Sequence, residues 1–337
     1  MNTIPIALGC TLVAAVLAGC GGSGGSSGDG SPPAVPLEIS VLGNRADLIS
    51  GGQALVEVKI PDSASVRAEQ IRMVLNGKDV TDAFALRENG RYMGLVEGLV
   101  EGGNTLVARA GDATAHLVIK NHPIGGPVFS GPQVGYWECT TKVASPTPDN
   151  PDLGEPLDEQ CNIAEPVYRY RYRTLDGTFA VYDPSNPPPP EQIARTTTHE
   201  GNTVPYIVRI ERGVINRGKY DIAYLANPED PTKGWTPYAR PASWNGKLHW
   251  KFGSGCEFGR RQGNPGNVLD HVALSRGFMV ASSEMTQYGT HCNDVTSAET
   301  VMMLKEHITE NYGEIRFTTA DGSSGGAHQQ HLHASNY

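Results

Sequence analysis

A short β-prone run that enters a glycine-rich turn and then a helix-compatible segment constrains this chain more than any other feature. Ile315–Thr319 reads as a strand, Gly322–Gly326 as the turn and Ala327–Ser335 as a helix. The turn has the pattern Gly-x-Ser-x-Gly, which in this order is typical of a nucleophile elbow. The serine of such an elbow sits at a strained turn, so that its hydroxyl projects above the sheet.

The spacing selects Ser324 as the candidate nucleophile. Gly322 and Gly326 then flank it, and side chains at those two positions would collide across the turn. Centring the motif on Ser323 would place Asp321 where a small residue is needed. An ordinary glycine-serine loop is the alternative, because the bare motif is a weak signal.

The histidines that follow the elbow do not form an obvious site. On a helix, His328 and His331 lie about 60° apart, whereas His333 points about 160° away from His331. The three side chains cannot converge on one ion, so we expect no metal and no cofactor. His328 is one turn beyond Ser324, but a catalytic histidine normally arrives on a separate loop.

The sequence order of the catalytic triad in serine hydrolases predicts where the partners of Ser324 lie. In this class the acid and the histidine follow the serine, and the sequence reaches Tyr337 one short helix after Ser324. We therefore expect the partners of Ser324 to lie beyond Tyr337. The 337-residue chain should be an N-terminal fragment with little or no turnover.

The N-terminus predicts export. Residues 1–20 resemble a lipoprotein signal peptide, with an apolar run too short to span a bilayer and a lipobox-like end at Cys20, the candidate lipidation site. Residues 21–36 are rich in Gly, Ser and Pro and read as a tether. The interpretation places the protein in the cell envelope, at the outer membrane or in the periplasm, with a lipid anchor as its membrane contact. A simple secretory signal is the alternative.

Composition narrows the classes of partner. The formal net charge of −9 gives no reason to expect nucleic acid. The 40 Gly and 24 Pro among 337 residues argue for many turns rather than long helices. Beyond Cys20 the exported chain has four cysteines, an even number that favours disulfides over metal ligands.

Residues 37–122 read as a small β module. Six short strand-like runs alternate apolar and polar residues, as Val56 and Val58 do against Glu57. This density of strands suggests an immunoglobulin-like sandwich. Nothing in the module has catalytic spacing, so it is either a spacer or a surface for substrate attachment.

Residues 123–337 read as the beginning of an α/β sheet. Strands are expected at 204–210, 220–225, 247–252 and 277–282, and a helix at 296–311, where Thr296 and Glu299 fit a capping box. The predicted fold class is therefore an N-terminal all-β immunoglobulin-like module followed by the first half of an α/β-hydrolase fold, incomplete at its C-terminus.

The expected order of strands predicts which residues form an oxyanion hole. One N–H comes from Gly325, directly after the nucleophile, and the other from the loop after the third strand. The candidates in that loop are Gly253 and Ser254, between which the sequence does not decide. On the same edge as Ser324, after the fourth strand, we expect Tyr288, His291, Asn293 and Asp294, which could line a substrate pocket. Asp294 could equally begin the following helix.

The cysteines allow three pairings, and strand order favours one. Cys256 follows the third expected strand and Cys292 the fourth, so two neighbouring parallel strands would bring both to one edge of the sheet. Cys139 and Cys161 would then staple the Pro- and Asp-rich loop between them.

Several stretches together resemble one family. The sequence is similar to an exported bacterial α/β-hydrolase family catalogued as a domain of unknown function, and more distantly to tannases, feruloyl esterases and hydroxybutyrate-oligomer hydrolases. The resemblance spans about 37–337 and is carried by residues 76–84, 121–132, 250–256, 292–294 and 322–330. It implies that Ser324 is the nucleophile, that the Gly253 loop serves the oxyanion and that the chain continues past Tyr337. Tannase-like enzymes also place a cysteine beside the nucleophile, and neither Ser323 nor Gly325 is one.

These observations favour an exported serine hydrolase that acts on small or oligomeric carboxylic esters. The alternative is a surface-attached binding or structural lipoprotein that carries a remnant of a hydrolase. A peptidase of similar topology is a third reading, which acyl esters and peptide amides would distinguish.

Overall fold

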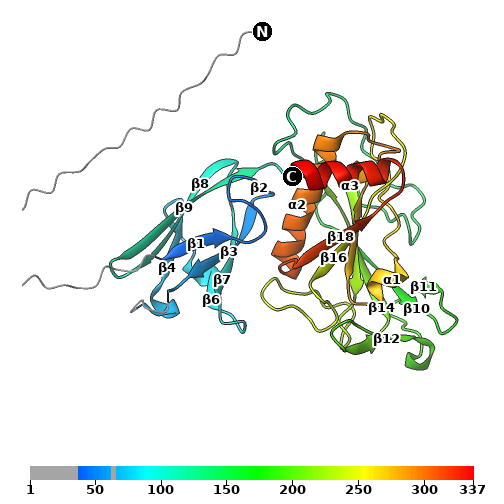
Figure 1. The fold of residues 1–337 in the computed structure, drawn as a ribbon, viewed down its shortest axis with the longest axis horizontal. Coiled ribbons are helices and arrows are strands. Elements are labelled where there is room, and N and C mark those ends of the chain that lie inside the picture. Colours follow the sequence, from blue (N-terminus) through cyan, green and yellow to red (C-terminus); the bar gives the residue numbers. More distant parts are fainter. Residues whose placement is uncertain (1–36, 62–65) are drawn as a thin grey trace, which may run out of the picture. The chain divides into compact units, whose positions relative to one another are not determined.

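A computed structural model describes residues 37–61 and 66–337 (Figure 1). The described residues form one compact unit. Cys20, the predicted signal peptide and the predicted tether lie outside the described residues. Within the described part of the chain, no helix is both long and apolar enough to cross a membrane.

The first part of the described chain forms two sheets that share one core. One sheet has the order β1-β3-β7-β6 and the other β2-β9-β8-β4-β5. All neighbouring strands are antiparallel except β2 and β9. The strands are β1 (Glu38–Val41), β2 (Ile49–Ser50), β3 (Gln53–Lys59), β4 (Arg72–Leu75), β5 (Lys78–Asp79), β6 (Phe84–Leu86), β7 (Tyr92–Glu97), β8 (Gly102–Ala110) and β9 (Ala113–His122).

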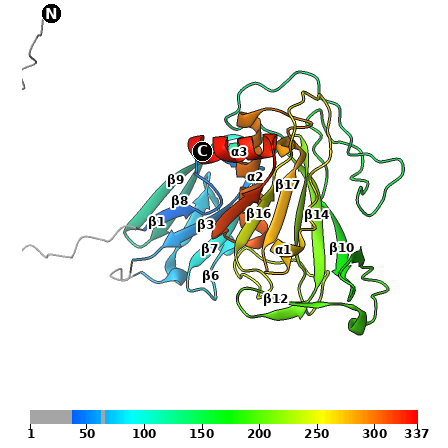
Figure 2. The same cartoon turned by 45° about the vertical axis from the view of Figure 1, so that its right-hand side comes forward.

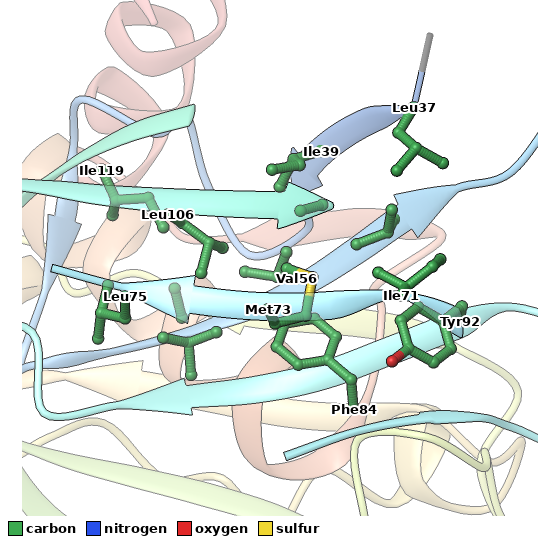
Figure 3. Close-up of a cluster of buried hydrophobic side chains, with 14 of the residues drawn as sticks. Leu37, Ile39, Val56, Ile71, Met73, Leu75, Phe84, Tyr92, Leu106 and Ile119 are labelled. Carbon is green, nitrogen blue, oxygen red and sulfur yellow. The ribbon is translucent and has the colours of Figure 1, made fainter. Parts of the chain in front are cut away.

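Apolar side chains from both sheets meet between them. Val56 of β3 packs with Met73 of β4, and Leu106 of β8 lies close to Ile119 of β9 (Figure 3). Successive side chains of a strand point to opposite faces, so Glu57 lies on the face away from this core. Each large apolar side chain buried here contributes about 1.5–3 kcal/mol.

The rest of the chain is built on one seven-stranded sheet of order β11-β10-β14-β15-β17-β16-β18 (Figure 2). The strands from β11 to β17 pair antiparallel, and β16 pairs parallel with both β17 and β18. The bounds are β10 (Val167–Arg173), β11 (Phe179–Val181), β14 (Ile207–Ile215), β15 (Gly218–Leu225), β16 (Lys247–Lys251), β17 (Met279–Ser283) and β18 (Phe317–Asp321), with a separate pair β12 (Arg195–Thr197) and β13 (Thr203–Pro205).

Three α-helices accompany these sheets in the described residues, namely α1 (His271–Leu274), α2 (Asp294–Tyr312) and α3 (Gly325–Asn336). Ile222 and Leu248 face α2 in one core, while Ala223 and Val280 face α1 in another. The period of two along β15 thus separates the two faces of the sheet. Short 3-10 turns lie at Ala68–Gln70, Thr81–Ala83, Pro190–Gln192 and Glu284–Thr286.

The predicted fold class is wrong. The described chain is mostly β-sheet, with four sheets and few helices, rather than an immunoglobulin-like module followed by a helix-rich α/β-hydrolase half. Four of the six strand pairings in the large sheet are antiparallel, and such pairs need no crossover helix. Hydrophobic alternation predicted many individual strands, but it carries no information about which strands pair.

The capping box predicted at Thr296 and Glu299 is also wrong. The N-cap of α2 is Asn293, whose side chain accepts a hydrogen bond from the Thr296 N–H. Glu299 lies inside the helix and its carboxylate is buried. It accepts hydrogen bonds from the successive backbone amides of residues 128–130 at 2.6–2.9 Å. A contact so distant in sequence outweighed the local capping signal.

Two further buried acids of α2 contact the N-terminal sheets. Glu306 accepts hydrogen bonds from the Ser50 N–H at 2.7 Å and from the Asn44 side-chain amide at 2.9 Å. Glu310 accepts one from Gln53 at 3.1 Å, and its other oxygen has no partner among the described residues. Burial raises the pKa of Glu306 to about 7. Burial, followed by the nearby Glu306 charge, raises the pKa of Glu310 well above its usual value.

These raised pKa values predict that Glu310→Gln stabilises the protein at alkaline pH. Such a carboxyl has a higher pKa in the folded state than in the unfolded state. Its contribution to stability is fully present below the unfolded-state pKa and is lost as the pH rises toward the folded-state pKa. The variant should therefore gain roughly 1–3 kcal/mol in free energy of unfolding at pH 8.5 and little at pH 5. Urea denaturation at both pH values measures this.

Glu101→Gln is the matched control, because Glu101 is exposed. This substitution should leave the free energy of unfolding unchanged at both pH values. An equal gain for Glu310→Gln at both pH values would show that ionisation of Glu310 does not destabilise the fold.

Candidate functional site

Ser324 occupies the sharp turn between β18 and α3. Its backbone angles are φ 52° and ψ −118°, and it precedes the first residue of the helix. A positive φ is uncommon outside glycine and is sterically costly. The residue is exposed, and within the described residues its hydroxyl makes no hydrogen bond. The turn thus presents a free serine hydroxyl to solvent at the end of a strand.

The flanking glycines allow the turn to pack closely. A Cβ on Gly322 would lie 2.9 Å from the Phe252 carbonyl oxygen and 3.0 Å from the Gly326 Cα. A Cβ on Gly326 would lie 3.0 Å from the same oxygen. The backbone after β16 therefore runs directly against the elbow, as the steric interpretation of the motif requires.

The loop after β16 contains the two candidate oxyanion donors. The Gly253 N–H donates to the Thr286 carbonyl at 3.0 Å, so this N–H is already used. The N–H groups of Ser254 and Gly325 have no hydrogen-bond acceptor within the described part of the chain. A Cβ on Gly325 would lie 2.2 Å from the Gly255 carbonyl oxygen, which places residues 254–255 against the first turn of α3.

Gln329 of α3 holds this loop in place. Its side chain is fully buried, and its amide donates to the Gly253 carbonyl at 3.1 Å. Its oxygen accepts from the Ser297 hydroxyl of α2 at 2.7 Å. No role for Gln329 was predicted from the sequence. A glutamine one helical turn from the elbow is a weak signal without the contacts.

The two disulfides are the pairs that strand order favoured. Cys256 bonds to Cys292 and Cys139 to Cys161. The first bridge links the loops that follow the parallel strands β16 and β17. The same loops exchange backbone hydrogen bonds, from Glu257 to Tyr288 at 2.8 Å and from Cys292 to Glu257 at 2.9 Å.

The polar residues expected along this edge have different roles. A ring carbon of Tyr288 lies 3.3 Å from the Cβ position of Gly325, next to the elbow. His291 stacks on Trp137 with ring centroids 4.5 Å apart, and burial lowers its pKa to about 4. Asp294 is the first residue of α2.

A charged cluster on β16 and the end of β18 was not predicted. The Lys251 ammonium lies 3.0 Å from an Asp270 oxygen and 2.7 Å from an Asp321 oxygen, and His249 lies within 4 Å of both carboxylates. The group has the residue types of a metal site. The ammonium already bridges the two acids, so we interpret the cluster as an ion-pair network that fixes the strand entering the elbow.

The histidines after Ser324 do not gather around its hydroxyl. His333 packs edge-on against Phe252 at 5.2 Å between ring centroids, and burial lowers its pKa. His328 and His331 are exposed. In the described residues, no histidine side chain forms a hydrogen bond with the Ser324 hydroxyl, and the one histidine contact of Ser324 is the His328 backbone N–H, which donates to the Ser324 carbonyl at 3.1 Å. The site there consists of a nucleophile candidate and amide donors.

The position of Gln329 predicts that Gln329→Leu destabilises the fold. The Gly253 carbonyl and the Ser297 hydroxyl would each lose a buried partner, at a cost of roughly 1–3 kcal/mol. Urea denaturation measures the loss. Gln192→Leu is the control, because Gln192 is exposed, and it should cost less. Equal losses in the two variants would contradict the assigned role of Gln329.

Comparison with known proteins adds one result. No curated protein matches the sequence. The sequence profile of a tannase-like family of unknown function (DUF6351) matches residues 39–337. The resemblance to a family of unknown function with a distant relation to tannases is thereby confirmed. The match covers nearly all of the described residues, and the chain belongs to this tannase-like family.

Proposed function

We propose that this protein is a serine hydrolase that acts on small or oligomeric carboxylic esters, with Ser324 as its nucleophile. One observation carries the proposal: an exposed serine hydroxyl at positive φ, between a strand and a helix, beside two backbone N–H groups without acceptors. Family membership supports the class of reaction, since tannases are esterases.

The chemistry follows from the groups at the turn. The Ser324 oxygen attacks the ester carbonyl carbon, and its proton passes to a general base. The N–H groups of Gly325 and Ser254 then donate to the oxyanion that forms. Ser254 is preferred to Gly253 because the Gly253 N–H is bonded to Thr286. Collapse of this intermediate releases the alcohol, and water hydrolyses the acyl-serine.

Membership in a tannase-like family does not identify which ester is the substrate. Tannase-like enzymes place a cysteine next to the nucleophile, and the neighbours of Ser324 are a serine and a glycine. We therefore propose ester hydrolysis as the reaction class and do not propose gallate esters as the substrate.

Ser324→Ala tests the nucleophile. In protein isolated from its native host, the variant should lose about 10³-fold or more of kcat/KM toward p-nitrophenyl acetate and butyrate. Ser323→Ala is the matched control, because Ser323 is an exposed serine of the same turn. It should retain activity within about threefold. Circular dichroism melts establish that both variants fold.

Three results would overturn the proposal. Wild-type protein without activity on any acyl ester is one, and turnover of peptide amides alone is another. Equal losses in Ser323→Ala and Ser324→Ala would show that the motif has been centred on the wrong residue.

We also propose that the protein is exported and lipid-anchored through Cys20, at the outer membrane or in the periplasm. The sequence of residues 1–20 supports this. The two disulfides are consistent with an extracellular protein, since such bonds persist in oxidising compartments.

Cys20→Ser tests the anchor. Wild-type protein should incorporate radiolabelled palmitate and sediment with membranes, whereas the variant should do neither. A control substitution at Ser23, also within residues 21–36, should leave both properties unchanged. Palmitate incorporation into Cys20→Ser would contradict the lipid anchor at this residue.

A further inference from the structure

We propose that a cavity beside the elbow binds the carboxylate of a small acid with an apolar body. The cavity has a volume of about 690 Å³ and is lined by Lys219 of β15 together with residues 140, 142–144, 150, 257–259, 261–264 and 289–290. This site goes beyond the proposed esterase function, because it would hold a free acid apart from Ser324.

Lys219 supplies the central argument. Only 4% of this residue is exposed, yet it lines the cavity. Its ammonium donates to the Thr140 hydroxyl at 3.0 Å and to the Thr140 carbonyl at 3.4 Å. Among the described residues, no carboxylate lies within 4 Å of it. A buried charge without a counter-ion is unfavourable, and an anion in the cavity would supply the missing partner.

The buried acid Glu284 forms no ion pair with Lys219. Glu284 is fully buried, and burial raises its pKa well above the usual value. One of its oxygens accepts from the Gly263 N–H. The other has no partner within the part of the chain that the structure describes. Burial lowers the pKa of Lys219, and a carboxylate in the cavity would stabilise its charged form.

The remaining lining fits an acid with an apolar body. Arg261 adds positive charge, and Glu257 is the one acid among the lining residues. Lys142 also lines the cavity, but it is paired with Asp152 at 3.7 Å and Glu155 at 3.6 Å. Arg261 is exposed and forms no ion pair with the described acids. Phe258 is 82% exposed at the same cavity, although aromatic side chains are usually covered. A guanidinium and an ammonium above a carboxylate, with an aromatic ring beside it, suit an aromatic acid.

The cavity adjoins Ser324 through a short series of contacts. Gly289 lines it, and the Gly289 Cα lies 2.9 Å from the Cβ position of Gly255. The Gly255 carbonyl in turn packs on Gly325, directly after Ser324. A ligand held by Lys219 would thus lie on the other side of the loops that border the elbow.

Benzoate and its neutral analogue benzamide test the proposal by calorimetry on the full-length protein. Benzoate should bind the wild type at least tenfold more tightly than benzamide does. Lys219→Met should lose at least tenfold in benzoate affinity, while Lys219→Arg should retain most of it. Ser324→Ala should bind benzoate like the wild type, because the cavity is separate from the nucleophile.

Lys305→Met is the matched control. Lys305 is a partly buried lysine that lines a different cavity, and its substitution should leave benzoate affinity unchanged. Lys219→Met removes an unpaired buried charge, so it should melt no lower than the wild type, and misfolding would be seen directly in that melt.

The outcomes separate this proposal from the esterase function. Absence of benzoate binding to the wild type, or unchanged binding to Lys219→Met, overturns the carboxylate site. Equal losses in Lys219→Met and Lys305→Met also overturn it. Benzoate binding that depends on Lys219 in a protein without esterase activity would uphold the site and reject the proposed reaction.

Discussion

The buried carboxylate of Glu299 is the interaction on which the arrangement of the described chain depends. It accepts hydrogen bonds from three successive amides of the segment that leaves the N-terminal sheets. It also accepts one from the Asn216 side chain at 3.1 Å, in the turn between β14 and β15. One charged group thus joins α2, the connecting segment and the central hairpin. Hydrogen bonds to a charged group contribute about 1.5–3 kcal/mol each.

The same helix joins this junction to the candidate site. Ser297, two residues before Glu299, donates to Gln329, and Gln329 donates to the Gly253 carbonyl. On the following turns, Glu306 and Glu310 contact the N-terminal sheets. α2 therefore has polar buried contacts along most of its length, where an ordinary amphipathic helix would have apolar ones. Its position relative to the elbow is fixed by hydrogen bonds of defined direction as well as by packing.

Local sequence patterns predicted individual strands, turns and helices. Strand pairing and distant side-chain contacts could not be predicted, because they depend on residues far apart in the sequence. The strand, turn and helix around Ser324 were predicted because glycine spacing is a local steric requirement. The cysteine pairs followed from the order of β16 and β17. The fold class failed because pairing direction is not encoded in alternation, and Glu299 was misassigned because its partners lie about 170 residues away. Lys219 was missed for a related reason: β15 is buried on both faces, so it lacks the alternation that would mark an inward-facing lysine.

The strained geometry of Ser324 can persist only because its surroundings determine it. A non-glycine residue at a sparsely populated backbone conformation costs about 1–3 kcal/mol, and an isolated turn would relax. Here Gly322 and Gly326 pack against the Phe252 carbonyl, and Gln329 holds the neighbouring Gly253 carbonyl of the same loop. The disulfide between Cys256 and Cys292 then joins that loop to its neighbour. Close contacts that hold a strained serine in place suit a nucleophile, because a preorganised site needs little rearrangement in the reaction step. The same rigidity explains why two amide N–H groups remain without acceptors beside it, since neither loop is free to move and satisfy them.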